Sequence, residues 1–440
     1  MKKNDHILGT RRFLPMFLTQ FFGALNDNVF KQSLVVIFTF GWIQHQGLEI
    51  STLNNLAALL FILPFFIFSA TAGQIADKYE RSKLIRAIKI LEILIMLIAT
   101  LGFMFGSLWL LIFALFLMGT HSTFFGPIKY AILPDILHKD ELVQGNAIFQ
   151  SGTSIAILIG MVLGGAIIFW SQGEMLWISL TVLVIAIVGY LCSRYILPQP
   201  IPDAKLTVDW NFLHTSIDTL RYAKSLPTVF LVLLGNSWYW FYGATFLTQI
   251  PLLAKQYLHG SENVASLLLM LFSVGIGIGS LLCKKIGGTQ INLKVVMLGC
   301  VGLTLFAFYL TISLGFLPPV TNGQVLGLYD VFHAGMAYYH VMFAVALLGI
   351  FGGFYIVPLY TMMQAFAPVS HRARVVSANN ILNAIFMVTA SIFSILILSF
   401  LELDLTVLFN ITAILSAIFS LLLLKYLQPL IATTPYSLED

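Results

Sequence analysis

The chain alternates between long apolar runs and short polar segments. Most of the runs reach about 20 residues or more, the length that an α-helix needs to cross the hydrocarbon core of a bilayer. We expect helices at about 13–42, 53–76, 84–104, 108–129, 142–170, 175–196, 228–254, 262–283, 293–315, 338–365, 373–400 and 405–426. The pattern predicts an all-α membrane protein with twelve transmembrane helices in two six-helix halves.

The first run is interrupted by a polar stretch, "TQFFGALNDNVFKQS", residues 19–33. It carries Gln20, Asn26, Asp27, Asn28 and Lys31 within about three helical turns. Ionisable residues inside a membrane-spanning helix are rare, and they face a cavity or a partner because lipid cannot solvate them. We therefore expect Asp27 to belong to a binding site. Two alternatives stay open: the amides lock helix packing, or Lys31 pairs with Asp27 at i+4.

The composition and the distribution of charge agree with a membrane protein. Charged residues make up 10% of the chain and hydrophobic residues 59%, whereas soluble domains have about 25% charged residues. Lys and Arg precede the first run and gather in alternate loops after it, which places both termini in the cytoplasm under the positive-inside rule. The three cysteines lie in or beside apolar runs and predict no disulfide framework. The sequence also predicts no metal site and no cofactor.

The longest cytoplasmic connection, about 197–227, joins the sixth and seventh runs. It divides the chain into an N-terminal half (1–196), a linker (197–227) and a C-terminal half (228–440). Within the linker, "WNFLHTSIDTLRYAK" predicts a short amphipathic helix lying on the membrane surface. Its apolar face would carry Trp210, Leu213, Ile217, Leu220 and Ala223.

The two halves share a sequence pattern between their helices, and this pattern indicates an internal repeat. The connection after the fourth run reads "LPDILHKDELVQGNAIFQ", and the one after the tenth reads "APVSHRARVVSANNILNAIF". Each has a proline, a short charged loop and then an apolar helix that opens with asparagine: Asn146 in one half, Asn379 or Asn380 in the other. A parallel repeat of six spans is typical of transporters whose halves rock about a central site. The alternative is that apolar helices resemble one another by composition alone.

The loop between the second and third runs reads "GQIADKYERSK", residues 73–83, with the spacing G-x-x-x-D-K-x-x-R-x-K. It resembles the signature loop of the major facilitator superfamily, and the resemblance implies the major facilitator fold. Physically, a glycine permits close helix packing, and the aspartate can meet the positive N-terminal end of a neighbouring helix. The expected gating residues are Gly73, Asp77, Lys78, Arg81 and Asp135, with Arg81 reaching Asp135. The alternative is an ordinary charged loop.

Within that superfamily, several segments resemble the bacterial lysophospholipid transporter family: "QFFGALNDNVFK", "GPIKYAILPDI" and "GGFYIVPLYTMMQ". The resemblance implies inward flipping of lysophospholipids, notably lysophosphatidylethanolamine, across the bacterial inner membrane for re-acylation. It also implies a separate acyltransferase as functional partner. We expect a monomer in contact with membrane lipid, and no nucleic acid. One departure concerns the head group, because Leu247 stands near where some members have an arginine.

The fold that this resemblance implies lines its central cavity with spans 1, 4, 7 and 10. Asp27 and Lys129 then offer opposite charges to a zwitterionic head group, an ammonium approaching the carboxylate and a phosphate approaching the lysine. Amide and aromatic side chains would complete the site. The expected substrate-binding set is Asp27, Asn28, Gln20, Lys129, His121, Gln150, Asn236, Tyr239 and Tyr360.

Other functions remain as alternatives to a lysophospholipid transporter. A proton-coupled exporter of drugs or other small amphipathic solutes would use the same fold, with Asp27 as the proton carrier. A scaffold or receptor that had lost transport is disfavoured by the gate motif and Asp27. An enzyme is not expected, because the chain lacks an H-x-x-x-x-D motif, a G-x-x-x-x-G-K-[ST] phosphate loop and a metal-ligand cluster.

Overall fold

The computed structural model describes residues 7–39, 50–288, 292–318 and 325–434, and these residues are almost entirely helical. They include twelve helices of 19 residues or more: α1 (Leu14–Thr39), α2 (Ile50–Lys78), α3 (Arg81–Met104), α4 (Leu108–Ala131), α6 (Leu142–Trp170), α7 (Met175–Ser193), α9 (Pro227–Gln256), α10 (Glu262–Gly287), α11 (Leu293–Leu314), α13 (Met336–Phe366), α14 (Arg372–Ile395) and α15 (Leu405–Thr433). Short elements join them: η1 (Ile7–Gly9), α5 (Leu133–Ile136), η2 (Lys139–Glu141), α8 (Phe212–Lys224), α12 (Leu328–His333), η3 (Val369–His371) and the π-helical η4 (Leu396–Phe400).

Ten of these long helices have the length and the apolar composition needed to cross a membrane. The prediction of an all-helical membrane protein is therefore confirmed. The other two are α1 and α9, whose interior polar residues lower their mean hydropathy. They correspond to two of the four spans, 1 and 7, that are expected to line a cavity.

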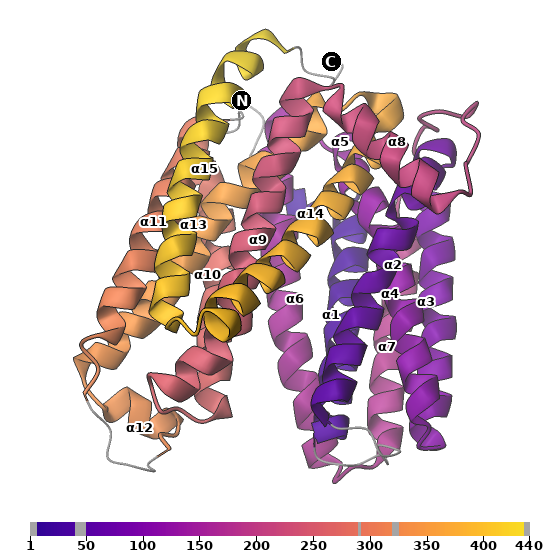
Figure 1. Ribbon diagram of the computed structural model, residues 1–440. Coiled ribbons are helices and arrows are strands. Elements are labelled where there is room, and N and C mark those ends of the chain that lie inside the picture. The colour runs from indigo at the N-terminus through magenta and orange to yellow at the C-terminus, as the bar shows by residue number, and fades with distance from the viewer. Residues whose placement is uncertain (1–6, 40–49, 289–291, 319–324, 435–440) are drawn as a thin grey trace.

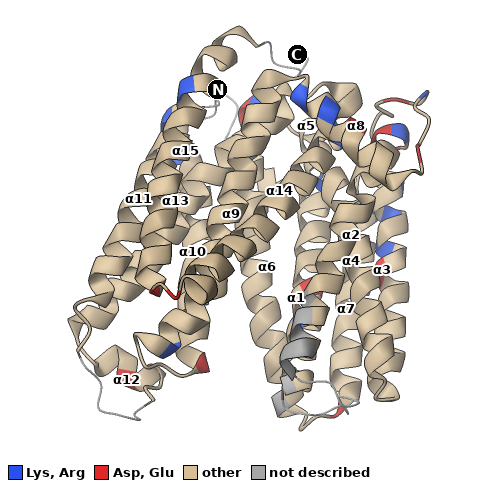
Figure 2. Ribbon diagram, in the orientation of Figure 1, with Lys and Arg blue, Asp and Glu red and all other residues tan. Residues whose placement is uncertain are grey.

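The helices form two groups, α1–α7 and α9–α15, which lie side by side and diverge toward the end that carries α12 (Figure 1). Buried hydrophobic side chains cluster mostly within each group. Figure 2 shows that Lys and Arg gather toward the end where α5 and α8 lie. We call this end of the molecule the basic end. The end that carries α12 is called the opposite end.

Glycines let neighbouring helices of the second group approach closely. A Cβ added at Gly279 of α10 would lie 1.9 Å from the carbonyl oxygen of Ile350 in α13, and one added at Gly275 would lie 2.3 Å from that of Ala346. No side chain fits at such separations. The run "GIGIGS" therefore serves helix packing.

The linker helix is present, most of its predicted apolar face is exposed, and its contact with a membrane surface stays a prediction. α8 packs against α2, α9 and α14, and the ring of Phe212 lies 5.0 Å from that of Phe68. Ala223, predicted on the membrane face, is buried, whereas Leu213 and Ile217 are exposed. The contact with protein uses both small side chains, such as Thr215 and Thr219, and the rings of Phe212 and Tyr222.

Candidate functional site

A cavity of about 260 Å³ lies between the two helix groups. Six of the nine predicted substrate-binding residues line it: Gln20, Asp27, Asn28, His121, Lys129 and Tyr360. Further lining side chains come from both groups, among them Lys31, Tyr130, Trp240, Asn380 and Asn383. The cavity is thus bounded by polar and charged groups from α1 and α4 on one side and by aromatic and amide groups from α9, α13 and α14 on the other.

Asp27 is held by a neighbouring helix. Its Oδ2 accepts a hydrogen bond of 2.8 Å from the Ser122 hydroxyl of α4, and its other carboxylate oxygen is buried without a partner in the described part of the chain. Lys31 does not form the ion pair with Asp27 that the i+4 spacing suggests, as far as the described residues show. Its Nζ lies 4.4 Å from the ring centroid of Phe61 instead. Both charges therefore remain available to a ligand.

Lys129 lies near the basic end of α4, and its Nζ is 5.1 Å from the ring centroid of Tyr130. Tyr130 stacks on Tyr360 of α13 across the two groups, with ring centroids 4.5 Å apart and planes 5° from parallel. Both rings line the cavity, so the stack joins the two groups beside the lysine.

A second set of polar groups is buried behind the cavity wall. Glu92 of α3 accepts hydrogen bonds from Lys89 at 2.5 Å and from Asn26 of α1 at 2.8 Å. The Nε2 of His121 lies 3.3 Å from the same carboxylate. Asn26 therefore serves helix packing, one of the alternatives that the sequence leaves open. His121 belongs both to this cluster and to the cavity wall.

Three predicted binding residues do not line the cavity in the described structure: Gln150, Asn236 and Tyr239. The Asn236 amide is fully buried and faces the Met363 sulfur at 4.0 Å. Tyr239 packs on Gly352, where an added Cβ would lie 3.2 Å from its ring. Gln150 is half-buried on α6. Tyr239 points along a different helix face from its neighbour Trp240, whereas Gln150 and Asn236 precede the lining residues Thr153 and Trp240 by about one turn, toward the basic end. None of the three lines the cavity in this structure, and their role in binding stays a prediction.

The adjacent residue Trp240 takes the place expected for Tyr239. Its indole Nε1 lies 3.1 Å from the side-chain amide of Asn383, and Asn383 contacts the Asn379 amide at 3.0 Å in the orientation that satisfies both groups. An aromatic-rich helix gives little polarity contrast between its faces, so the sequence does not signal which ring faces inward.

Asp77 joins α2 to the start of α14 at the basic end. Its carboxylate accepts hydrogen bonds from the backbone N–H groups of Ala373 at 3.0 Å and Arg374 at 3.1 Å. The Arg374 Nε and the Arg81 Nη2 each donate to it at 3.2 Å. Gly73, one turn earlier, makes this approach possible, because an added Cβ would lie 3.0 Å from the Ala373 carbonyl oxygen.

Asp135 of α5 lies between two arginines from different helix groups. Arg81 of α3 donates to one carboxylate oxygen, and Arg372 of α14 donates to the other at 3.0 Å. The Arg81–Asp135 contact expected from the sequence is therefore present. Lys78 forms no ion pair in the described residues, and its Nζ lies 5.5 Å from the Tyr79 ring instead. The gating role of these residues stays a prediction.

Two further contacts join the groups toward the basic end. The amides of Asn146 and Gln364 exchange hydrogen bonds of 2.6 and 3.1 Å between α6 and α13. Lys284 of α10 donates to the Gln144 side chain of α6 at 2.6 Å. The basic end is thus closed in this structure.

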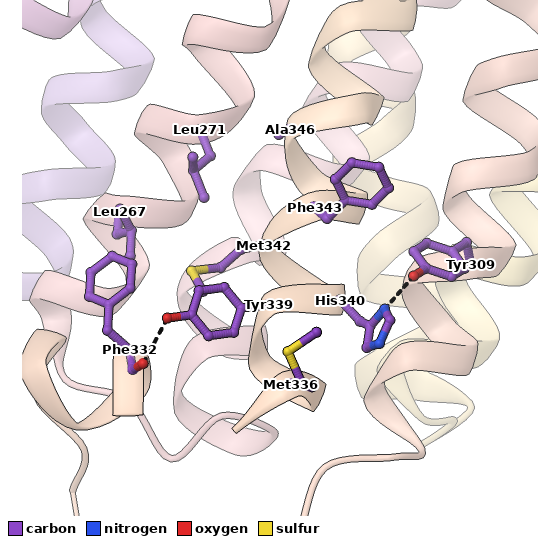
Figure 3. A pocket seen from close by; sticks show the side chains of 10 residues that line it. All are labelled: Leu267, Leu271, Tyr309, Phe332, Met336, Tyr339, His340, Met342, Phe343 and Ala346. Atoms are coloured by element: carbon purple, nitrogen blue, oxygen red, sulfur yellow. Dashed lines mark hydrogen bonds between the residues drawn. The ribbon is translucent and has the colours of Figure 1, made fainter. Parts of the chain in front are cut away.

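A second cavity, of about 520 Å³, lies at the opposite end among α10, α11, α12 and α13 (Figure 3). Its walls are mainly Leu, Met and Phe side chains. Figure 3 shows the two polar contacts there: the Tyr309 hydroxyl lies 2.5 Å from His340 Nδ1, and the Tyr339 hydroxyl donates to the Phe332 carbonyl at 2.8 Å. These polar atoms are satisfied within the protein, and the walls carry no Asp, Glu, Lys or Arg in the described residues. The central cavity is therefore the better candidate for a charged head group.

Comparison with known proteins places the chain among transporters. A family model for the Major Facilitator Superfamily matches residues 16–317 and 239–437. Proteins named Lysophospholipid transporter LplT are similar to the chain. The one from Pectobacterium carotovorum is 24% identical over 359 residues, covering 81% of this chain and 78% of the relative. The one from Escherichia coli O157:H7 is 22% identical over 362 residues, covering 81% of each.

Solved structures show the same fold at low sequence identity. The Escherichia coli fucose:proton symporter FucP superposes with a TM-score of 0.70 at 10% identity, covering 94% of this chain and 98% of that one. A bacterial homologue of the iron transporter ferroportin, in an outward-facing state, gives a TM-score of 0.65 at 16% identity, covering 96% and 100%. These likenesses concern the fold alone.

Proposed function

The chain belongs to the major facilitator superfamily, and we propose that it transports lysophospholipids by alternating access to its central cavity. The observation that carries this proposal is the cavity between the two helix groups, where Asp27, Lys31 and Lys129 lie among aromatic side chains. A lysophospholipid has one charged head and one acyl chain, so it needs charges at one place and apolar walls elsewhere. The relatives named for lysophospholipid transport support the same substrate.

The topology follows from the charge asymmetry along the chain. In our proposal α1 and α9 cross the membrane as well, which makes twelve spans with both termini in the cytoplasm. The basic end is then the cytoplasmic end, and the membrane is the bacterial inner membrane. The two six-helix units are residues 1–196 and 228–440, joined by the linker at 197–227.

The closed basic end defines one state of the transport cycle. In our proposal the network around Asp77 and Asp135 holds the cytoplasmic side shut while a head group enters from the opposite side. Opening then requires the α14 N-terminus to leave Asp77 and Arg372 to leave Asp135. The α2–α14 contact at Gly73 and the Asn146–Gln364 pair would separate in the same step.

We also propose the direction of transport and its use. The lysolipid moves inward, and an acyltransferase at the cytoplasmic face restores the second acyl chain. The transporter itself carries out no covalent chemistry in this scheme. The proton-coupled exporter draws no support from the relatives named for lysophospholipid transport.

Uptake by spheroplasts tests the proposal. Cells that lack their own lysophospholipid transporter would express this chain, and labelled lysophosphatidylethanolamine or lysophosphatidylglycerol would be added outside. Albumin then extracts what remains in the outer leaflet. We expect an albumin-resistant fraction above that of cells expressing an unrelated transporter at equal level. Uptake no higher than this control for either lipid would overturn the proposed substrate.

A further inference from the structure

The charges that line the central cavity do not cancel. Among the described residues, the Asp, Glu, Lys and Arg side chains in its wall are Asp27, Lys31 and Lys129. One carboxylate against two ammonium groups leaves an excess of one positive charge. Neither lysine has an ion-pair partner in the described part of the chain, and each lies instead near an aromatic ring.

The charged groups packed behind the wall do not remove this excess. Glu92 and Lys89 are both fully buried and pair with each other at 2.5 Å, so together they add no net charge. His121 contacts Glu92 and is neutral in this count. Protonation of His121 would increase the positive excess and leave its sign unchanged.

The backbone positions of the three charged residues alternate in sign along the helix axes. Lys31 lies four residues beyond Asp27 on α1, about 6 Å toward the opposite end, and Lys129 lies seven residues from Ser122 on α4, about 10 Å toward the basic end. Because Ser122 holds the Asp27 carboxylate, the order from the opposite end is positive, negative, positive. A phosphate that enters from that end meets Lys31 first and Lys129 last.

We propose that, among lysophospholipids, this cavity selects those whose head group carries a net negative charge and no amine. This inference rests on the proposed function and adds the head-group class. A phosphodiester without an amine, as in lysophosphatidylglycerol, brings the cavity to zero net charge. A zwitterion such as lysophosphatidylethanolamine can satisfy Asp27 and one lysine, and it leaves the other lysine uncompensated in a partly enclosed site.

The test compares the two lipids in the spheroplast assay. For the wild type we expect lysophosphatidylglycerol to be preferred over lysophosphatidylethanolamine by about tenfold in initial rate at limiting concentration, the effect of one partly screened unit charge. Lys31→Gln brings the empty cavity to zero net charge and should lower the ratio toward one. Lys129→Gln removes one positive charge at the other lysine position. It replaces Lys31→Gln in the test if that variant does not reach the membrane.

A matched control separates cavity charge from total charge. Lys294→Gln removes one positive charge from the exposed start of α11, and it should leave the ratio unchanged. Equal wild-type rates for the two lipids, or a wild-type preference that both cavity variants retain, would overturn the head-group inference and keep the proposed function. Transport of neither lipid would overturn the proposed function itself.

Discussion

Removal of the Asp77 charge gives a direct test of the closed basic end. Asp77→Asn keeps the size of the side chain but replaces one acceptor oxygen with an NH₂ group. Four donors converge on the wild-type carboxylate: two backbone N–H groups at the start of α14 and the side chains of Arg81 and Arg374. The new NH₂ group would face donors, so at least one of the two oxygen positions loses its bonds.

The size of the effect follows from burial. Asp77 is fully buried, and its contacts across the two groups are the bonds from the Ala373 and Arg374 backbone N–H groups and from the Arg374 side chain. Hydrogen bonds to a charged group contribute about 1.5–3 kcal/mol each, and the Arg81 contact lies within one group, so about 3 kcal/mol is expected for the closed state. A loss of about 3 kcal/mol in the closed state shifts the ratio of closed to open molecules by roughly 100-fold.

Distances between spin labels would report this shift. One pair of labels belongs at the exposed positions Lys83 and Lys285 at the basic end, and a second pair at Glu174 and Glu262 at the opposite end. In Asp77→Asn we expect the first distance to lengthen and the second to shorten, because the two ends open alternately.

The control is Asp140→Asn, which removes one carboxylate from an exposed site at the same end. It should leave both distance distributions as they are in the wild type. If Asp77→Asn also leaves both unchanged at equal protein quality, then Asp77 does not hold the basic end closed and the gate must depend on other contacts.

Three smaller changes test neighbouring parts of the account. Gly73→Ala places a Cβ 2.3 Å from the Ser377 hydroxyl oxygen and 3.0 Å from the Ala373 carbonyl oxygen of α14, so the same labels should show a partial shift toward an open basic end; an unshifted distribution would refute the close-packing argument. Asn146→Ala removes the amide pair between α6 and α13 and should shift the equilibrium in the same direction by about 1 kcal/mol; unchanged label distances would contradict this. The hydrogen bond to Asp209 raises the pKa of His214 above its ordinary value. The protonated histidine therefore stabilises α8 fully at a pH below the ordinary pKa, and this stabilisation is lost as the pH rises through the raised pKa. Intrinsic-rate-corrected hydrogen exchange at the start of α8 should therefore speed up toward alkaline pH, and His214→Gln should remove this dependence.

Much of the architecture follows from the sequence because it depends on the length and spacing of the apolar runs. Apolar runs long enough to cross a bilayer become helices, and the twelve long helices of the described structure correspond to the twelve predicted runs. The contact between Arg81 and Asp135 could also be predicted, since both residues stand at helix ends that meet at the basic end in this fold.

The side-chain partners inside the membrane were harder to predict. Spacing alone suggests that Lys31 pairs with Asp27, yet Ser122 from another helix takes the carboxylate. The α9 positions Asn236 and Tyr239 were expected in the cavity, where the structure instead has Trp240. Helix rotation decides between Tyr239 and Trp240, and a helix that is apolar or aromatic on every face leaves its rotation unspecified in the sequence.

The central claim is that the cavity around Asp27 binds the lysophospholipid head group. The most direct measurement is albumin-resistant uptake of labelled lysophosphatidylethanolamine, whose ammonium is expected to approach Asp27, by spheroplasts that express the wild type, Asp27→Asn or Asp140→Asn at equal membrane levels. The account predicts uptake by the wild type and by Asp140→Asn, and a loss of about tenfold or more in Asp27→Asn. Uptake by Asp27→Asn at the wild-type rate would contradict it and would place the head-group site elsewhere in the protein.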